Sequence, residues 1–313
     1  MSGTIERSTG ALRLRLPATS ANLGSGFDAV AVALNFHLDI EAQPAAEFSI
    51  AATGRNVERC SRIEDNLVLE TYKRLLLANG RPIVPLAIDM RNGIPLAMGC
   101  GSSAAGRLAA LALAVHFGQL GWTSQRILDE AYLLEGHPDN VAACWLGGFV
   151  ATVCQGNTVH AAKVVPPAGW RAIVALPAVP LSTSKARAVL PASYSLTDVV
   201  ANLQSVSLLG LAFAQARADL LAPAMADRIH QPYRAPICPL LPLLLPLVGR
   251  HGILGAALSG AGPAVLVIVE NEASLERASR AIRHAFSSPD EAELLICRFE
   301  PLGASDQTDA AWQ

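Results

Sequence analysis

The sequence has little charge and few aromatic rings for its length. Charged residues make up 16% of the 313 residues and aromatic residues 5%. Lys and Arg total 24 against 26 for Asp and Glu, which gives a formal net charge of −2. The sequence shows no cluster of basic residues, so a general affinity for nucleic acid is not expected. Hydrophobic residues make up 51%, which is typical of a folded protein with a large core and excludes a disordered chain.

The chain also lacks the signals of a secreted or membrane protein. Its most apolar segment, residues 236–248, is shorter than a bilayer crossing and carries four prolines, so we expect no membrane segment there. Residues 1–10 are polar, and no secretory signal is expected. The six cysteines form no CxxC pair, which favours a reduced cytoplasmic compartment and gives no sign of a cysteine zinc site.

The length favours two domains. Two prolines and a glycine punctuate residues 166–169, so we predict domains of residues 1–168 and 169–313. In the first, the pattern predicts strands at residues 12–16, 36–40 and 83–90, with an apolar run at 29–34. It also predicts helices at 64–79 and 103–117, a helix capped by Thr123 or Ser124 that ends at Gly136, and a hairpin at 148–165.

In the second part, strands alternate with helices. The pattern predicts strands at residues 172–178, 255–259, 265–269 and 294–299, a short helix at 182–187, and helices at 198–218 (capped by Thr197), 223–230 and 272–286. This order predicts a small α+β sandwich with helices on one face of an antiparallel sheet.

A loop rich in glycine and serine, GIPLAMGCGSSAAG at residues 93–106, lies between a predicted strand and a predicted helix. Its glycines allow tight turns and close approach of a ligand, and the free amides at a helix start attract phosphate. Ser102 and Ser103 can cap the helix or turn a hydroxyl toward a phosphate-bound metal. It is not a Walker A loop, because Gly101 stands where that motif needs Lys, and its glycines do not fit GxGxxG. The alternative is a helix start with small residues for close packing.

Four further segments have a functional and a structural interpretation. In residues 17–34, Asn22 and Asp28 either hold a substrate or belong to a β-turn. Residues 133–148 place Glu135, His137, Asp139 and Asn140 together in what we predict to be a loop, where the alternatives are a helix cap and an Asx turn. Arg187 is a ligand or a surface charge. The turn at residues 260–263 either braces the phosphate loop or is a tight hairpin.

Three segments resemble, in this order, the three motifs of the GHMP small-molecule kinases, named for galactokinase, homoserine kinase, mevalonate kinase and phosphomevalonate kinase: PATSANLGSGFD, IPLAMGCGSSAAG and LSGAGPAV. EGHPDNVAA, STSKAR and HQPYRAP narrow the resemblance to the branch that phosphorylates L-homoserine on the way to threonine. The similarity runs from about residue 12 to residue 269. It implies an α+β fold with two domains, an N-terminal ribosomal S5-like domain and a C-terminal ferredoxin-like α/β sandwich.

The resemblance also implies a set of site residues. ATP would lie between the domains with its phosphates on the loop of residues 95–105, that is Pro95, Leu96, Ala97, Met98, Gly99, Cys100, Gly101, Ser102, Ser103, Ala104 and Ala105. Mg²⁺ would be held by Ser102 or Ser103 and by Glu135, with Asp129 and Glu130 as alternatives. The residues around homoserine would be Asn22, Asp28, His137, Thr183, Arg187 and Arg234. Asp139 and Asn140 would orient the hydroxyl, neither as a true general base.

These residue types suit the chemistry of a zwitterion. Asp28 offers a carboxylate for the ammonium group, and Arg187 and Arg234 offer planar cations for the carboxylate. Positioning and charge neutralisation do most of the work in phosphoryl transfer, so a strong base is not obligatory, and Mg²⁺ must supply charge because the loop has no Lys. The alternatives are another small-alcohol kinase and a catalytically silent binding protein. A homodimer is expected by analogy with the family.

The sequence departs from the family pattern at several positions. Cys100 stands where the family usually has Leu, and ATP protection of this thiol from reagents is a further expectation. Ala143 replaces a usual Pro, and Ala264 a usual Ser or Thr. The family tends to carry a helix at residues 236–248, where the prolines of this chain are expected to break it.

Overall fold

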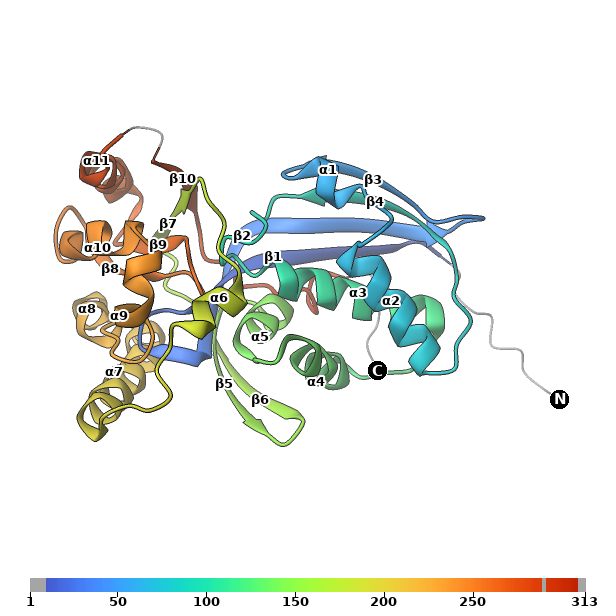
Figure 1. The fold of residues 1–313 in the computed structure, drawn as a ribbon, viewed down its shortest axis with the longest axis horizontal. Coiled ribbons are helices and arrows are strands. Elements are labelled where there is room, and N and C mark those ends of the chain that lie inside the picture. Colours follow the sequence, from blue (N-terminus) through green and yellow to red (C-terminus); the bar gives the residue numbers. More distant parts are fainter. Residues whose placement is uncertain (1–9, 289–290, 309–313) are drawn as a thin grey trace.

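The structure, a computed structural model, describes residues 10–288 and 291–308. The polar residues 1–9, which we predicted to carry no secretory signal, lie outside this range. Strands that end by Val164 form one sheet, and strands from Arg171 onward form a second. Figure 1 shows the two sheets at opposite ends of the long axis. This separation supports the proposed division between residues 168 and 169.

The first sheet is built around the long strand β2 (Gly26–Pro44). It pairs antiparallel with β1 (Leu12–Asn22), β4 (Leu86–Asn92) and β5 (Phe149–Gln155). At the two edges, β3 (Ser49–Gly54) runs parallel to β4, and β6 (Thr158–Val164) completes the predicted hairpin with β5. Along the start of β1 leucines face the core and arginines face out, as the alternating pattern predicts.

Helices cover one side of this sheet: α1 (Val57–Cys60), α2 (Leu67–Ala78), α3 (Ser102–Gly118), α4 (Ser124–Glu135) and α5 (Asp139–Leu146) (Figure 1). The central one, α3, is buried along almost its whole length. A helix that is apolar all round belongs inside a protein, and its many alanines let the neighbouring elements approach closely. Its first turn lies where the two halves of the molecule meet, which places the glycine-rich loop at that junction.

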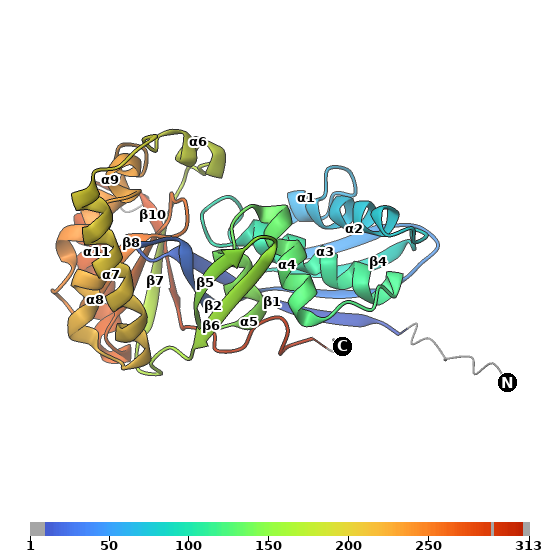
Figure 2. The same ribbon diagram turned by 90° about the horizontal axis from the view of Figure 1, so that it is seen from below.

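The second sheet is antiparallel, with the order β10 (Ala292–Cys297), β7 (Arg171–Pro177), β9 (Val265–Val269), β8 (Ile253–Leu258). One face packs on α10 (Leu240–Leu244) and α11 (Leu275–Ala285). The other face joins the main core together with α7 (Leu196–Ala214) and α8 (Leu221–Ala224). The predicted α+β sandwich is thus confirmed, with helices on both faces rather than one. Figure 2 shows α6 (Thr183–Ala188) reaching over the junction toward the first half.

Two of the predicted helices in the second half have different ends. The helix predicted at residues 198–218 is α7, and its cap is Ser195 rather than Thr197, because the Ser195 side chain accepts from the Asp198 amide. The helix predicted at 223–230 is wrong, since α8 ends at Ala224. The carboxylate of Asp227 accepts hydrogen bonds from the backbone amides of Ile229, His230 and Gln231. The next helix, α9 (Gln231–Arg234), begins at the last of these residues.

Some boundaries in the first half also differ. The predicted loop at residues 133–148 contains α5, which begins at Asp139 directly after Pro138, where proline is tolerated. The helix predicted from residue 64 begins at Leu67 because the Asn66 side chain caps it. The strand predicted from residue 83 begins only at Leu86. Strand β3 and helix α1 were not predicted, since most residues of that exposed edge strand give no clear apolar alternation.

The prolines of residues 236–248 divide that segment into short turns, as expected. The helix α10 spans Leu240–Leu244, with 3₁₀ turns at Ala235–Ile237 and Leu245–Leu247 beside it. Prolines stand at the starts of these pieces, where a missing amide costs nothing.

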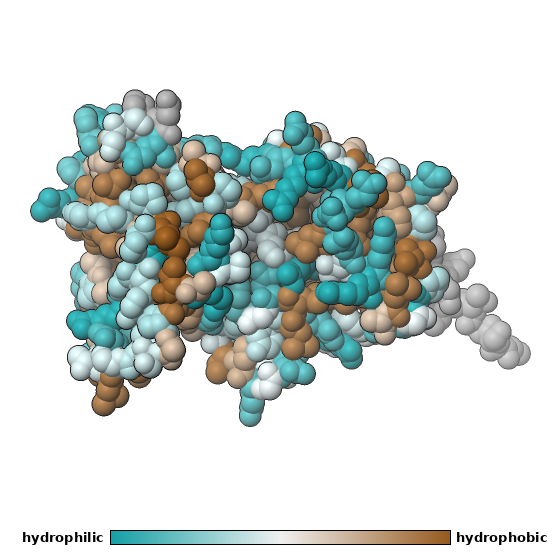
Figure 3. Space-filling model, in the orientation of Figure 1, coloured by the Kyte–Doolittle hydropathy of each residue, from teal (hydrophilic) through white to brown (hydrophobic). Residues whose placement is uncertain are grey.

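Helix α7 has an apolar exposed face. Leu196, Leu203 and Leu211 are exposed, and in Figure 3 apolar atoms project at the lower left, where α7 lies in Figure 1. Among the described residues, α7 is the one helix long and apolar enough to cross a membrane, on length and composition alone, with 17% of its apolar window buried. A single such helix is weak evidence for a span.

Candidate active site

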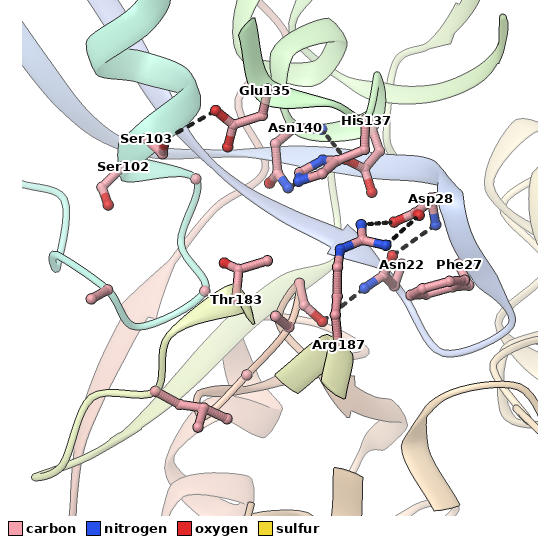
Figure 4. A pocket seen from close by; sticks show the side chains of 18 of the residues that line it. Asn22, Phe27, Asp28, Ser102, Ser103, Glu135, His137, Asn140, Thr183 and Arg187 are labelled. Atoms are coloured by element: carbon pink, nitrogen blue, oxygen red, sulfur yellow. Dashed lines mark hydrogen bonds and ion pairs between the residues drawn. The ribbon is translucent and has the colours of Figure 1, made fainter. Parts of the chain in front are cut away.

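A polar cavity lies between the two halves of the molecule (Figure 4). From the first half it is lined by Asn22, Phe27, Asp28, Ala97, Gly99, Gly101, Ser102, Ser103, Glu135, His137, Asp139 and Asn140, and from the second by Leu181, Thr183, Arg187, Arg234, Gly260, Ala261 and Gly262. The structure therefore brings together the candidates from six separate sequence segments. Phe27 and Leu181 were not named from the sequence, although each lies within or beside a motif, and Ala261 was named only as part of the turn at residues 260–263.

The start of α3 forms one wall of this cavity. Gly101 caps the helix with a φ of 72°, and a Cβ there would lie 1.9 Å from Oγ1 of Thr19. Only glycine fits this position. Neither Ser102 nor Ser103 caps the helix, contrary to one prediction, because both already lie in its first turn. Their amides have no acceptor within the helix, and together with the helix dipole they make a place for an anion.

The turn at residues 260–263 contacts the glycine-rich loop directly. The hydroxyl of Ser259 donates to the Gly99 carbonyl over 2.8 Å, and the Ala264 amide donates to the Met98 carbonyl over 3.3 Å. On its other side the Gly260 carbonyl accepts from Nδ2 of Asn22 over 2.7 Å. The turn thus braces the loop, and the interpretation as a hairpin alone is wrong.

Asp28 and Arg187 form a bidentate ion pair across the junction. Asp28 Oδ1 accepts from Nη2 of Arg187 over 2.7 Å, and Oδ2 accepts from Nη1 over 3.0 Å. Burial alone lowers the pKa of Arg187, but the bond to Asp28 outweighs it and the pKa is raised. The backbone of Asp28 has a φ of 54°, and its amide donates to Oδ1 of Asn22. The interpretation of Arg187 as a plain surface charge is therefore wrong.

A second guanidinium, that of Arg234, lines the same cavity. Arg234 is 1% exposed, and its Nε donates to the Ala186 carbonyl over 3.0 Å. Its Nη1 donates to Nδ1 of His230, whose pKa burial lowers. The ring of Phe27 lies 5.2 Å from Cζ of Arg234 and 5.4 Å from Cζ of Arg187. An aromatic face at this distance stabilises the two neighbouring cations.

The start of α5 supplies a linked set of polar groups. Asp139 is 1% exposed, and its Oδ1 lies 2.9 Å from Nδ1 of His137 and accepts from the Asn140 amide over 2.6 Å. Oδ1 of Asn140 accepts from Oγ1 of Thr19 over 2.6 Å. This hydrogen bond leaves the side-chain amide of Asn140 at the cavity. Because Thr19 also lies against Gly101, it connects Asn140 to the glycine-rich loop.

The His137–Asp139 pair is expected to make stability depend on pH. Burial lowers the pKa of His137, but the bond and charge of Asp139 raise it further, so the folded pKa lies above 6.5. The protonated His137–Asp139 pair contributes its full stabilisation to the unfolding free energy below the unfolded pKa of about 6.5. This contribution is lost as pH rises through the pKa of His137 in the folded protein. Urea unfolding from pH 5.5 to 9 should show His137→Asn losing about 1 kcal/mol at low pH and less at high pH.

The exposed His160 of β6 provides the matched control for this prediction. His160→Asn should leave the pH profile of the unfolding free energy unchanged. A His137→Asn profile parallel to that of the unaltered protein would contradict the assignment.

Oxygen donors for a divalent cation lie between α3 and α4. Oε2 of Glu135 accepts from Oγ of Ser103 over 2.9 Å (Figure 4). It also forms an ion pair with Nε of Arg107 at 2.7 Å, and that nitrogen donates to Oγ of Ser103 over 3.3 Å. A hydroxyl and a carboxylate are donors that suit Mg²⁺. The two alternatives lie outside the cavity, since Asp129 accepts from the Val159 amide and Glu130 pairs with Arg126. Asp28, His137 and Asp139 also place donor atoms within 4.8 Å of one another.

The predicted loop residues line several cavities or lie in the core. Ala97, Gly99, Gly101, Ser102 and Ser103 line the polar cavity. Pro95, Leu96 and Met98 line a separate hollow beside Arg55 and Pro177. Cys100, Ala104 and Ala105 are buried, so that only their backbone is available to a ligand.

A largely apolar cavity beside the start of α3 was not anticipated. Its lining includes Leu67, Val68, Met90, Ile94 and Leu96, and it reaches Ser102 and Gly106. Several of its lining residues lie at the start of α2, where the sequence indicated only the beginning of a helix. This cavity therefore meets the glycine-rich loop at Ser102, which also lines the polar cavity.

The Cys100 thiol does not behave as expected. It is 1% exposed, and burial raises its pKa to about 12. A buried neutral thiol reacts poorly, so ATP protection from thiol reagents is not expected here. All six cysteines are free, as predicted.

The chain matches known proteins in sequence as well as in fold. The family model for the GHMP kinases N terminal domain matches residues 66–148, and the model for the GHMP kinases C terminal domain matches residues 211–288. The chain is 42% identical to a homoserine kinase of Solibacter usitatus, over 82% of this chain and 84% of that protein. It is 40% identical to a homoserine kinase of Thermus thermophilus, over 87% of this chain and 92% of that protein.

Solved structures share the fold. A homoserine kinase of Cytophaga hutchinsonii superposes with a TM-score of 0.78 at 24% identity, covering 96% of this chain and 99% of that one. The mevalonate kinase of L. major in complex with R-mevalonate gives a TM-score of 0.71 at 15% identity, covering 97% and 100%. At these identities the likeness speaks for the fold alone, and it matches the predicted two-domain architecture.

Proposed function

The chain belongs to the GHMP kinase family, and we propose that it transfers the γ-phosphoryl group of ATP to the side-chain hydroxyl of L-homoserine. The observation that carries this proposal is the polar cavity, where the carboxylate of Asp28 and the guanidiniums of Arg187 and Arg234 lie together beside an anion site at the start of α3. The product is O-phospho-L-homoserine, an intermediate on the way to threonine. Relatives named homoserine kinase at 34–42% identity support the choice of substrate.

Homoserine lies, in this proposal, between the two halves. The carboxylate of Asp28 binds its ammonium group, and the guanidiniums of Arg187 and Arg234 bind its carboxylate. Asn22, His137 and Thr183 complete the polar wall around it. Planar cations bind a carboxylate in a fixed orientation, which directs the hydroxyl of the side chain toward the start of α3.

ATP lies with its phosphates on the amides of Gly101, Ser102 and Ser103, where the helix dipole favours negative charge. The apolar cavity that contains Leu67, Ile94 and Leu96 is the place for the adenine base, because it meets the same loop and its walls suit a flat apolar ring. Gly99 and Gly101 let the backbone approach the phosphates without a Cβ.

Ser103 and Glu135 are the residues that would hold Mg²⁺, by hydroxyl and carboxylate oxygens. When bound, the ion neutralises charge on the transferring phosphate. Asn140 orients the hydroxyl of homoserine, and Asp139 holds the His137 ring in place. The chain then acts mainly through position and charge, without a strong base.

The direct test is turnover with Mg-ATP. L-homoserine should be phosphorylated, whereas mevalonate, galactose and shikimate should react at least about 100-fold more slowly, since none offers both an ammonium and a carboxylate. Product should be identified by ³¹P NMR, with an arm in EDTA to test the dependence on metal. Turnover of another alcohol without turnover of L-homoserine would overturn the substrate, and ATP binding without any turnover would favour a silent binding protein.

Three accompanying proposals complete the picture. We propose domains of residues 1–168 and 169–313, supported by the two sheets. A cytoplasmic location fits the free cysteines. The homodimer stays a prediction from the resemblance.

A further inference from the structure

The two side chains that we assign to opposite charges of homoserine are each other's partner in the folded chain. Both oxygens of Asp28 and both terminal nitrogens of Arg187 take part, at 2.7 and 3.0 Å (Figure 4). A ligand carboxylate that binds the same two terminal nitrogens of Arg187 must therefore displace Asp28 from them. A ligand ammonium that binds Asp28 must in the same way compete with Arg187.

The pair can be opened from the cavity. The side chains are 38% exposed for Arg187 and 33% for Asp28, so a ligand reaches both. Asp28 is held at its backbone by the bond from its amide to Asn22. Arg187 extends from α6, a short helix of the other half, on a long flexible side chain. The guanidinium is thus the partner free to move.

The second guanidinium needs no such exchange. Among the described residues, Arg234 has no carboxylate within ion-pair distance, and its bonds go to the Ala186 carbonyl and the His230 ring. It is buried, whereas Arg187 is not. Only the Asp28–Arg187 pair must therefore be broken when a ligand binds. Arg234 attracts any ligand carboxylate without losing a partner of opposite charge.

From this arrangement we propose that the Asp28–Arg187 pair selects zwitterions, an inference that rests on the proposed function of the same site. A zwitterion exchanges one ion pair for two, with each released group taken by a ligand charge. A ligand with a carboxylate only must leave Asp28 unpaired next to its own negative charge. A ligand with an ammonium only must leave Arg187 unpaired next to a positive charge.

Competition between Arg187 and the ligand predicts a result that ammonium binding by Asp28 alone does not predict. Removing the charge of Asp28 frees Arg187, so a ligand with a carboxylate only should bind more tightly than to the unaltered protein. If Asp28 only bound the ammonium group, the affinity of such a ligand would stay the same. The test is therefore a gain of binding, which a damaged site cannot imitate.

The first arm uses calorimetric titration of 4-hydroxybutyrate, which is homoserine without its ammonium group. Asp28→Asn should bind it about tenfold more tightly than the unaltered chain. The matched control is Asp139→Asn, which removes one negative charge from the same cavity, because Asp139 bonds to His137 rather than to Arg187. It should give a gain of less than about threefold. Melting curves establish that each variant is folded.

The second arm uses 3-aminopropan-1-ol, which is homoserine without its carboxylate. Arg187→Gln should bind it about tenfold more tightly, because Asp28 is then free. A gain in only one arm or in neither, or an equal gain in Asp139→Asn, overturns the proposal. If those results accompany normal phosphorylation of homoserine by the unaltered chain, the proposed function stands and only the exchange fails. Without that phosphorylation, the proposed function itself fails.

Discussion

Arg187→Met is expected to raise the KM for homoserine by about 100-fold while changing the KM for ATP by less than about twofold. The substitution removes a bidentate partner of the substrate carboxylate and leaves Asp28 without its ion pair. The anion site at the start of α3 is formed by backbone amides, so it keeps its geometry. Steady-state kinetics with each substrate varied in turn measure the two constants.

Lys185 offers a matched control for this substitution. It lies on the same short helix, carries the same charge and is exposed. Lys185→Met should leave both KM values within about twofold, which separates the loss of a ligand from the loss of a charge on α6. Arg187→Lys should fall between, because it keeps the charge but cannot bind a carboxylate bidentately. An unchanged KM for homoserine in Arg187→Met would remove this residue from the site.

The assembly of the site could be anticipated because the chemistry is concentrated in short segments. Asn22 and Asp28 flank one glycine-rich turn, and Glu135 and His137 lie at the end of one helix. Each segment alone also had a structural interpretation. Only their order along the chain, matched to a family, brought them together, and the structure then placed them around one cavity.

Contacts across the junction could not be anticipated from the sequence. Nothing local indicates that Asp28 pairs with a guanidinium of α6, or that Phe27 lies near both arginines. The site residues are far apart along the chain, and a pattern of periodicity carries no information on such pairs. The apolar cavity beside Ser102 was missed for the same reason, because its walls come from several elements that each read as core.

The wrong helix ends have local causes that compete with propensity. Residues 223–230 contain good helix formers, but the Asp227 carboxylate binds three amides and directs the chain into a new turn. We predicted a loop at residues 133–148 because several polar residues lie close to Pro138 there. Proline is disfavoured inside a helix but suits its start, and α5 begins immediately after it.

Gly101→Ala is expected to lose ATP binding by at least about 100-fold and to destabilise the fold by about 3 kcal/mol or more. The added methyl would lie 1.9 Å from Oγ1 of Thr19 and 3.2 Å from its amide, at a φ of 72°. Either the start of α3 or strand β1 must move. Because Thr19 also holds Asn140, the shift reaches the hydroxyl-orienting side of the cavity as well. Titration with an ATP analogue and urea unfolding measure the two effects.

Gly121→Ala separates the clash from the backbone strain. Gly121 also has a positive φ, of 63°, but no atom lies within 4 Å of the added methyl. It should cost about 1–2 kcal/mol of unfolding free energy and leave ATP binding unchanged. If Gly101→Ala behaved like Gly121→Ala, binding nucleotide normally at the same small cost, the start of α3 would not be the phosphate site. The contact with Thr19 makes the opposite result the physical expectation, because neither backbone atoms nor a side chain fixed by Asn140 can give way cheaply.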